Sequence, residues 1–151
     1  MKILQSRDTM SDIYLDALRI RQDVFVKEQG VPEELEVDEY DPICVNFVLY
    51  DEEDKAIATA RLLENKQENS AKVQRVAVRK EARGKDYGKH VMEACERFAK
   101  EERLSALKLH AQLSALPFYE KLGYKVYGEE FMDAGIPHIR MKKEILGVRE
   151  K

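Results

Sequence analysis

The chain has 151 residues, of which 44% are hydrophobic and 36% are charged. This length suits one domain with a substantial core and is short for two. The 29 acidic residues and 26 lysines and arginines are interspersed, which disfavours a nucleic-acid binder because such a protein would gather a basic excess on one face. No apolar run is long enough for a leader or a membrane span, so we expect a cytoplasmic protein without membrane association.

Residues 2–7 are predicted to form a strand, after which Thr9 and Ser11 are candidate helix caps. The following apolar residues repeat at intervals of three and four, which predicts an amphipathic helix: Ile13, Ala17, Ile20 and Val24, with Leu18 and Phe25 widening the stripe. Gly30 and Pro32 should end this helix.

Residues 27–41 contain seven carboxylates and one lysine. Such a run is typical of a solvated loop or a short helix. The alternative is that it borders an active site, where its negative field would attract a cationic substrate such as an amine.

Three segments then read as strands joined by polar turns, at residues 43–50, 56–63 and 73–78. The turns lie at residues 51–55 and 64–70, and their short lengths predict an antiparallel meander.

The third of these strands leads into a glycine-containing basic turn, residues 79–89, and then into a helix that carries Tyr87, Val91, Cys95 and Phe98 at helical spacing. The first turn of a helix offers unpaired N–H groups and a positive dipole end, and glycine lets the backbone approach a ligand. The turn is therefore a candidate anion site. The alternative is a solvated, charged turn without a ligand.

Residues 104–110 are predicted to form a strand with Leu107 and Leu109 on one face. Residues 114–122 form a short helix that Gly123 closes, and residues 124–145 hold two strands around a loop at 133–137. Cys44 and Cys95 should be buried, reduced thiols, although spacing alone leaves a catalytic thiol open. His90, His110 and His138 lack metal-ligand spacing, so no metal is expected.

Two segments resemble motifs of the GNAT superfamily of N-acetyltransferases. The run Arg83-Gly-Lys-Asp-Tyr-Gly-Lys89 resembles its pyrophosphate loop, with Asp86 at a position where glycine is usual. The run from His110 to Tyr124 resembles its motif B through Ala115, Phe118, Tyr119, Gly123 and Tyr124, with Gln112 in place of the usual asparagine. Residues 21–29 and 133–141 are similar to the ElaA-like branch of the superfamily.

The resemblance covers nearly the whole chain and implies a single domain over residues 1–151. The implied fold class is mixed α/β, the GNAT or acyl-CoA N-acyltransferase fold. Its twisted, mostly antiparallel sheet has six to seven strands with helices on both faces, and the fourth and fifth strands splay apart to admit acetyl-CoA.

The resemblance also implies where acetyl-CoA would bind. The pantetheine amides would pair with the backbone of the fourth strand, and the pyrophosphate would lie on the basic turn. The implied cofactor-binding residues are Val76, Ala77, Val78, Arg83, Gly84, Lys85, Asp86, Tyr87, Gly88, Lys89, Gln112 and Tyr119.

Acetyl transfer needs a proton for the departing thiolate and an acceptor for the proton of the amine. Tyr119, with a reference pKa of ~10 against ~8.5 for a thiol, is the expected general acid, and a backbone N–H near Val76 or Ala77 would stabilise the oxyanion. The base stays open among His110, Glu28 and Asp38, the carboxylates acting through water. The expected substrate residues are Phe25, Glu28, Asp38 and His138.

The sequence thus predicts an enzyme that passes acetyl from acetyl-CoA directly to a primary amine on a cationic acceptor. A polyamine, an amino sugar and a protein amine all fit, and a homodimer stays open. One alternative is a non-catalytic acyl-CoA sensor, because Arg75 and Asp86 replace expected residues. A further alternative is an interaction domain that binds no cofactor.

Overall fold

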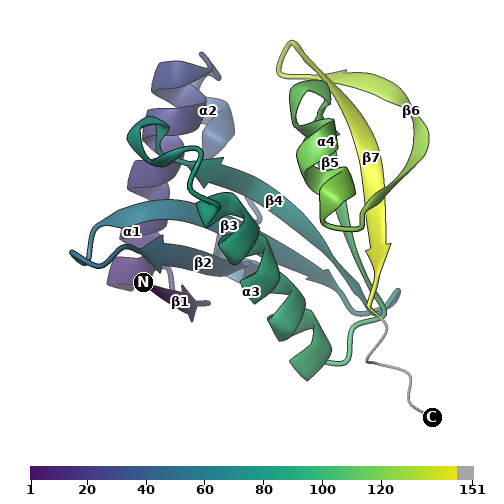
Figure 1. Ribbon diagram of the computed structural model, residues 1–151, viewed down its shortest axis with the longest axis horizontal. Helices are drawn as coiled ribbons and strands as arrows, with labels where there is room; N and C mark the ends of the chain where they lie inside the picture. Colours follow the sequence, from purple (N-terminus) through teal and green to yellow (C-terminus); the bar gives the residue numbers. More distant parts are fainter. Residues whose placement is uncertain (146–151) are drawn as a thin grey trace. The chain divides into compact units, whose positions relative to one another are not determined.

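A computed structural model describes residues 1–145 of the chain (Figure 1). Its strands are β1 (Lys2–Ser6), β2 (Val45–Tyr50), β3 (Ala56–Asn65), β4 (Ser70–Val78), β5 (Ala106–Gln112), β6 (Lys125–Asp133) and β7 (Ile136–Glu144). Its α-helices are α1 (Asp12–Arg21), α2 (Glu33–Glu36), α3 (Tyr87–Glu101) and α4 (Leu116–Lys121). A π-helical segment, η1 (Gln22–Glu28), and the short 3₁₀ turns η2 (Asp41–Ile43), η3 (Lys80–Ala82) and η4 (Leu113–Ala115) complete the elements.

The seven strands are hydrogen-bonded in the order β1-β2-β3-β4-β5-β7-β6. The pairs β1–β2, β2–β3, β5–β7 and β6–β7 are antiparallel, whereas β4 and β5 are parallel. The predicted mixed α/β class is therefore confirmed, with a seven-stranded sheet. The parallel pair follows from the connection, since the helix α3 carries the chain back before β5 begins.

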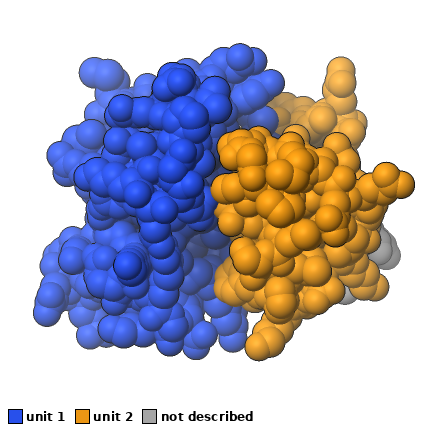
Figure 2. Space-filling view, turned by 90° about the horizontal axis from the view of Figure 1, so that it is seen from above, with its two compact units in different colours: residues 1–63, 75–95 blue, residues 64–74, 96–151 orange. Residues whose placement is uncertain are grey.

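The chain divides into two compact units, coloured separately in Figure 2. The first contains residues 1–63 and 75–95, and the second contains residues 64–74 and 96–145 of the described chain. Both β4 and α3 contribute residues to each unit. The prediction of a single domain stays a prediction.

In the first unit, α1 packs against β2. The core cluster there holds Ala17, Ile20, Val24, Val48, Tyr50 and Ala77, which matches the predicted apolar stripe. Ser11 is the cap, because its hydroxyl accepts a hydrogen bond from the Tyr14 N–H at 3.2 Å. The helix continues as the π-helical segment to Glu28, and Gly30 follows with φ of 77°, so the predicted end is confirmed.

In the second unit, α4 lies on the face of β5 that carries Leu107 and Leu109, both buried. This helix begins at Leu116 and not at the predicted Ser114, because the 3₁₀ turn η4 precedes it and Pro117 lies in its first turn. The loop expected at residues 133–137 is shorter, since Ala134 and Gly135 turn the chain with φ of 53° and 75°.

Cys44 and Cys95 are both buried and neither forms a disulfide, as predicted. Burial raises the pKa of the Cys44 thiol, which disfavours the reactive thiolate. None of the helices in residues 1–145 is long and apolar enough to cross a membrane.

Candidate functional site

The predicted anion site is a turn between β4 and α3 whose backbone enters the left-handed region twice. Gly84 has φ of 85° and Asp86 has φ of 66°. His90 donates the first hydrogen bond of the helix, to the Asp86 carbonyl at 3.1 Å. The N–H groups of residues 87–89 therefore precede the helical ladder. Successive amides in such a turn converge on one concave point, the arrangement that binds phosphate groups.

The left-handed φ of Asp86 gives the physical reason why glycine suits this position. A residue with a Cβ pays on the order of 1 kcal/mol there, although aspartate tolerates the region better than most residues. Asp86 is exposed. The departure from the family pattern therefore leaves the turn geometry intact and adds a negative charge beside the amides.

Arginine side chains tie the turn to η1. Arg79 pairs with Asp23 and donates to the Ala56 carbonyl at 2.9 Å. Arg83 donates to both carboxylate oxygens of Glu28, at 2.5 and 2.6 Å, and to the Val78 carbonyl at 3.0 Å. Arg83, predicted to hold pyrophosphate, is thus held by the carboxylate of Glu28.

Two of the predicted substrate residues, Glu28 and Phe25, make contacts within the first unit. The hydrogen bonds from Arg83 lower the pKa of Glu28 against a small opposing desolvation, so this carboxylate is a poorer base than its reference state. Phe25 is partly buried and packs against the core cluster of the first unit.

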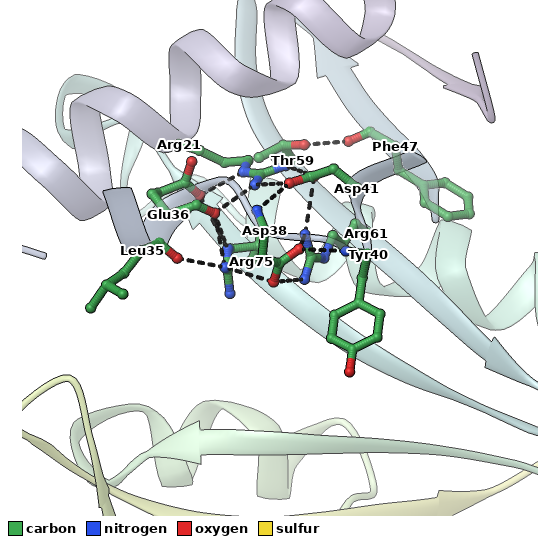
Figure 3. A network of polar contacts seen from close by, with 10 residues as sticks. All are labelled: Arg21, Leu35, Glu36, Asp38, Tyr40, Asp41, Phe47, Thr59, Arg61 and Arg75. Carbon is green, nitrogen blue, oxygen red and sulfur yellow. Dashed lines mark hydrogen bonds and ion pairs between the residues drawn. The ribbon is translucent and has the colours of Figure 1, made fainter. Parts of the chain in front are cut away.

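A buried network of charges lies beside β3 and β4 (Figure 3). Arg21 and Arg61 have no exposed surface, and Glu36 and Asp41 are 3% and 2% exposed. Arg21 donates to Glu36 at 2.6 Å and to Asp41 at 2.8 Å, while Arg61 reaches Asp41 at 3.0 Å. Burial alone would raise the pKa of Asp41, but the hydrogen bonds and charge of Arg21 outweigh burial and lower it.

Asp38 and Arg75 extend the network toward solvent. Asp38 accepts from Arg61 at 3.0 and 2.8 Å and from Arg75 at 3.3 Å. These contacts outweigh desolvation and lower the pKa of Asp38, so its carboxylate is poorly suited to the role of general base. Arg75 also donates to the Glu36 carbonyl at 2.8 Å.

Arg75 interrupts β4, because its φ of 57° lies in the left-handed region, whereas the residues of a regular strand have negative φ. The pairings of its guanidinium with Glu36 and Asp38 hold this bulge in place. The bulge directly precedes Val76, whose backbone N–H was predicted to stabilise the oxyanion. Sequence reasoning noted Arg75 only as a departure from the family pattern and missed the roles of Arg21 and Arg61.

The network changes the interpretation of the acidic segment. Four of its seven carboxylates pair with arginines: Glu28, Glu36, Asp38 and Asp41. The interpretation as a wholly solvated segment is wrong for Glu36 and Asp41, which are buried. The negative field that was expected to attract a cationic acceptor is therefore largely neutralised by the protein's own arginines.

Tyr119, the predicted general acid, lies in α4 and is 8% exposed. Its ring makes edge contacts with Phe118 at 4.9 Å and Tyr124 at 6.0 Å between centroids. Its carbonyl accepts the N–H groups of Leu122 and Tyr124, which closes the helix before Gly123. The aromatic contacts fix the ring, and a fixed phenol is a prerequisite for directed proton donation.

A second group of predicted residues meets on β5 and β7. His138 lies opposite Gln112, and its ring stacks on Phe131 at 5.8 Å, while His110 meets the edge of Phe131 at 5.0 Å. The Arg140 guanidinium lies 4.9 Å above the same ring. Sequence reasoning missed Phe131 and Arg140, because the pairing of β6 with β7 brings Phe131 to His138 and the pairing of β5 with β7 brings Arg140 to His110.

The two histidines differ as proton acceptors. His138 Nδ1 lies 2.7 Å from the Ile136 carbonyl, which can only accept, so Nδ1 carries the proton and Nε2 of the neutral ring is an acceptor. Desolvation, followed by the charges of Lys72 and Arg140, lowers the pKa of His110, which favours the neutral form of its imidazole. Both rings are therefore candidate bases.

The predicted cofactor residues fall in both units. Residues 76–78 and 83–89 belong to the first unit, and Gln112 and Tyr119 belong to the second. Within residues 1–145, no cluster of three or more His, Cys, Asp or Glu side chains has the geometry to hold a metal ion.

Comparison with known proteins identifies the family of the chain. Residues 14–145 match the model of the acetyltransferase (GNAT) domain. The uncharacterized N-acetyltransferase YjcF of Bacillus subtilis is 42% identical over 130 residues, covering 85% of this chain and 91% of YjcF.

Two solved structures share the fold over nearly their whole length. An acyl-CoA N-acyltransferase from Pseudomonas aeruginosa has a TM-score of 0.83 at 26% identity and covers 94% of this chain and 98% of its own. Escherichia coli ElaA has a TM-score of 0.83 at 25% identity, and the match covers 95% of this chain and 100% of ElaA. The chain therefore belongs to the GNAT acetyltransferase family.

Proposed function

We propose that the protein transfers the acetyl group of acetyl-CoA directly to a primary amine. The observation that carries this proposal is the turn at residues 83–89, where two left-handed residues and the first amides of α3 form a phosphate cradle. When bound, acetyl-CoA supplies an activated acyl thioester. Gly84 has open space where a Cβ would lie, which suits the close approach of a pyrophosphate.

Separate residues bind the cofactor, stabilise the oxyanion and donate the proton. Lys85 and Lys89 add positive charge beside the amides of the turn. The backbone of residues 76–78 aligns pantetheine, and the Val76 N–H, set by the bulge at Arg75, is a donor for developing negative charge on oxygen. Tyr119 donates its phenolic proton to the departing sulfur.

Removal of the amine proton falls to the histidine pair. His138 Nε2 is the better candidate, because the Ile136 carbonyl fixes the ring and its tautomer. His110 is the alternative acceptor on the same sheet face. Glu28 and Asp38 are less suitable, because arginines hold both carboxylates and lower their pKa values.

A specific observation favours a second candidate function, a sensor that binds acyl-CoA without turnover. Arg75 occupies the bulge of β4 and its guanidinium is committed to carboxylates, so this part of the strand offers no carboxylate base. A sensor binds acetyl-CoA but releases no more free thiol with amines than without them.

The test is a thermal unfolding scan with acetyl-CoA, followed by thiol release against a panel of amines. Cofactor at 100 times its Kd adds about 2.7 kcal/mol of stability, a rise in Tm on the order of 5 to 10 °C. Gly88→Glu should abolish the shift, since it adds bulk and negative charge to the turn. Tyr119→Phe should keep the shift and lower thiol release. No Tm rise in the natural protein would refute both candidate functions.

A further inference from the structure

Four lysines form a continuous row across four strands of the second unit. Lys72 of β4 lies opposite Lys108 of β5, Lys108 lies opposite Lys142 of β7, and Lys142 lies opposite Lys125 of β6. Directly opposed residues project from the same face of a sheet. At about 4.8 Å between strands, the row spans about 14 Å.

The row lies on the more exposed of the two faces. On the opposite face, Leu107, Leu109 and Met141 are fully or almost fully buried. On the lysine side, the Lys108 and Lys142 side chains are 30% and 43% exposed, and Lys125 and Arg140 are also exposed. We call this side, defined by the lysine row and Arg140, the lysine face.

The next row of the lysine face contains one candidate base, His110, and the other, His138, lies one row further along, opposite Gln112. His110 lies opposite Arg140, which in turn lies opposite Tyr127. This row is displaced by two residues along the strands, about 7 Å from the lysine row. The guanidinium of Arg140 rests on the Phe131 ring at 4.9 Å, so its orientation is defined.

Like charges that lie directly opposite one another destabilise a sheet. Carboxylates compensate the positive charge of the row only in part, since Glu68 pairs with Lys108 at 3.0 Å and Glu144 pairs with Lys142 at 3.7 Å. The chain as a whole carries a net charge of −3, so this concentration of cations is not a result of composition. Such a row is suited to a multiply charged anion that bridges the strands.

We propose that the lysine face binds the phosphate group of the acceptor, which makes the acceptor a phosphorylated primary amine. The proposal rests on the proposed function, because it places the amine beside His110, the candidate base in the adjacent row. The distance between the two rows then selects acceptors whose amine and phosphate lie about 7 Å apart. The pairing of four of the seven carboxylates with arginines supports the same choice, since it weakens the field that a polycation would need.

Isothermal titration calorimetry with a series of aminoalkyl phosphates of increasing length tests the proposal. Each is compared with the amino alcohol of equal length and with inorganic phosphate. The protein is saturated with CoA, so that the turn at residues 83–89 is filled and no turnover occurs. Lys142→Gln and Arg140→Gln remove charge from the lysine face. Lys100→Gln, an exposed lysine of α3, is the control with the same change of net charge.

The expected result is that aminoalkyl phosphates spanning about 7 Å bind at least tenfold more tightly than their alcohols and than inorganic phosphate. Each face variant should weaken this binding about tenfold or more, and Lys100→Gln should leave it unchanged. Thiol release should follow the same preference. Equal binding of phosphate and alcohol partners, or equal binding by the face variants, would overturn the proposal.

Failure of the proposed function gives a different pattern. If CoA does not bind, the same titrations on the cofactor-free protein still report on the lysine face through Lys142→Gln and Arg140→Gln. Tight binding of inorganic phosphate alone, equal to that of the aminoalkyl phosphates, would refute an acceptor site. Binding without thiol release would retain the phosphate site and reject the transferase.

Discussion

Asp41→Asn should cause a large loss of stability. Asp41 is 2% exposed and accepts hydrogen bonds from Arg21 at 2.8 and 3.2 Å, from Arg61 at 3.0 Å and from the Asp38 N–H at 2.9 Å. The substitution keeps the shape but leaves two buried guanidiniums short of one negative charge. Breaking a buried ion pair from one side costs about 3 to 5 kcal/mol. For a chain of this size, Tm should fall by about 9 to 15 °C.

Urea unfolding and a thermal scan measure this loss. Asp54→Asn is the matched control, because Asp54 has φ of 62°, which asparagine accepts, and its ion pair with Lys2 is exposed. That change should alter the free energy of unfolding by less than about 1 kcal/mol. A cost for Asp41→Asn no greater than that of the control would show that the buried network contributes no more than a surface ion pair, and the reasoning would be refuted.

Three further predictions concern the acidic segment and the turn at residues 83–89. Asp38 and Asp41 have lowered pKa values in the folded protein. Their contribution to the free energy of unfolding is therefore complete above the unfolded pKa of ~3.9 and is lost as the pH falls through the folded values. Acid unfolding followed by circular dichroism should begin at a higher pH in Asp41→Asn. Glu28→Gln should tighten CoA binding several-fold in calorimetry, because it releases Arg83 from its bidentate partner, and weaker binding would contradict the competition. Asp86→Gly should also tighten CoA binding, since it removes both a negative charge and the left-handed strain at φ of 66°, whereas an unchanged Kd would exclude Asp86 from the cofactor site.

Local patterns in the sequence predicted much of the fold. The helical stripe from Ile13, the cap at Ser11 and the stop at Gly30 depend on neighbouring residues and are confirmed. The basic turn was also predictable, because its glycines and the start of α3 are adjacent in the chain. The exact start of α4 was not, since the 3₁₀ turn before Pro117 competes closely with an α-helical turn.

Local spacing predicted the order of most elements, because periodicity depends on residues close together in the chain. The resemblance of residues 83–89 and 110–124 to two family motifs implied the fold class and the family. Only the tertiary structure decided which charges meet. It pairs Arg21 with Asp41 across 20 positions and Arg75 with Glu36 across 39, and thereby neutralises a segment whose local charge suggested the opposite. Strand register likewise aligned Lys72, Lys108, Lys142 and Lys125 into one row. Electrostatic fields sum over distances in space, so segments far apart in sequence decide their sign.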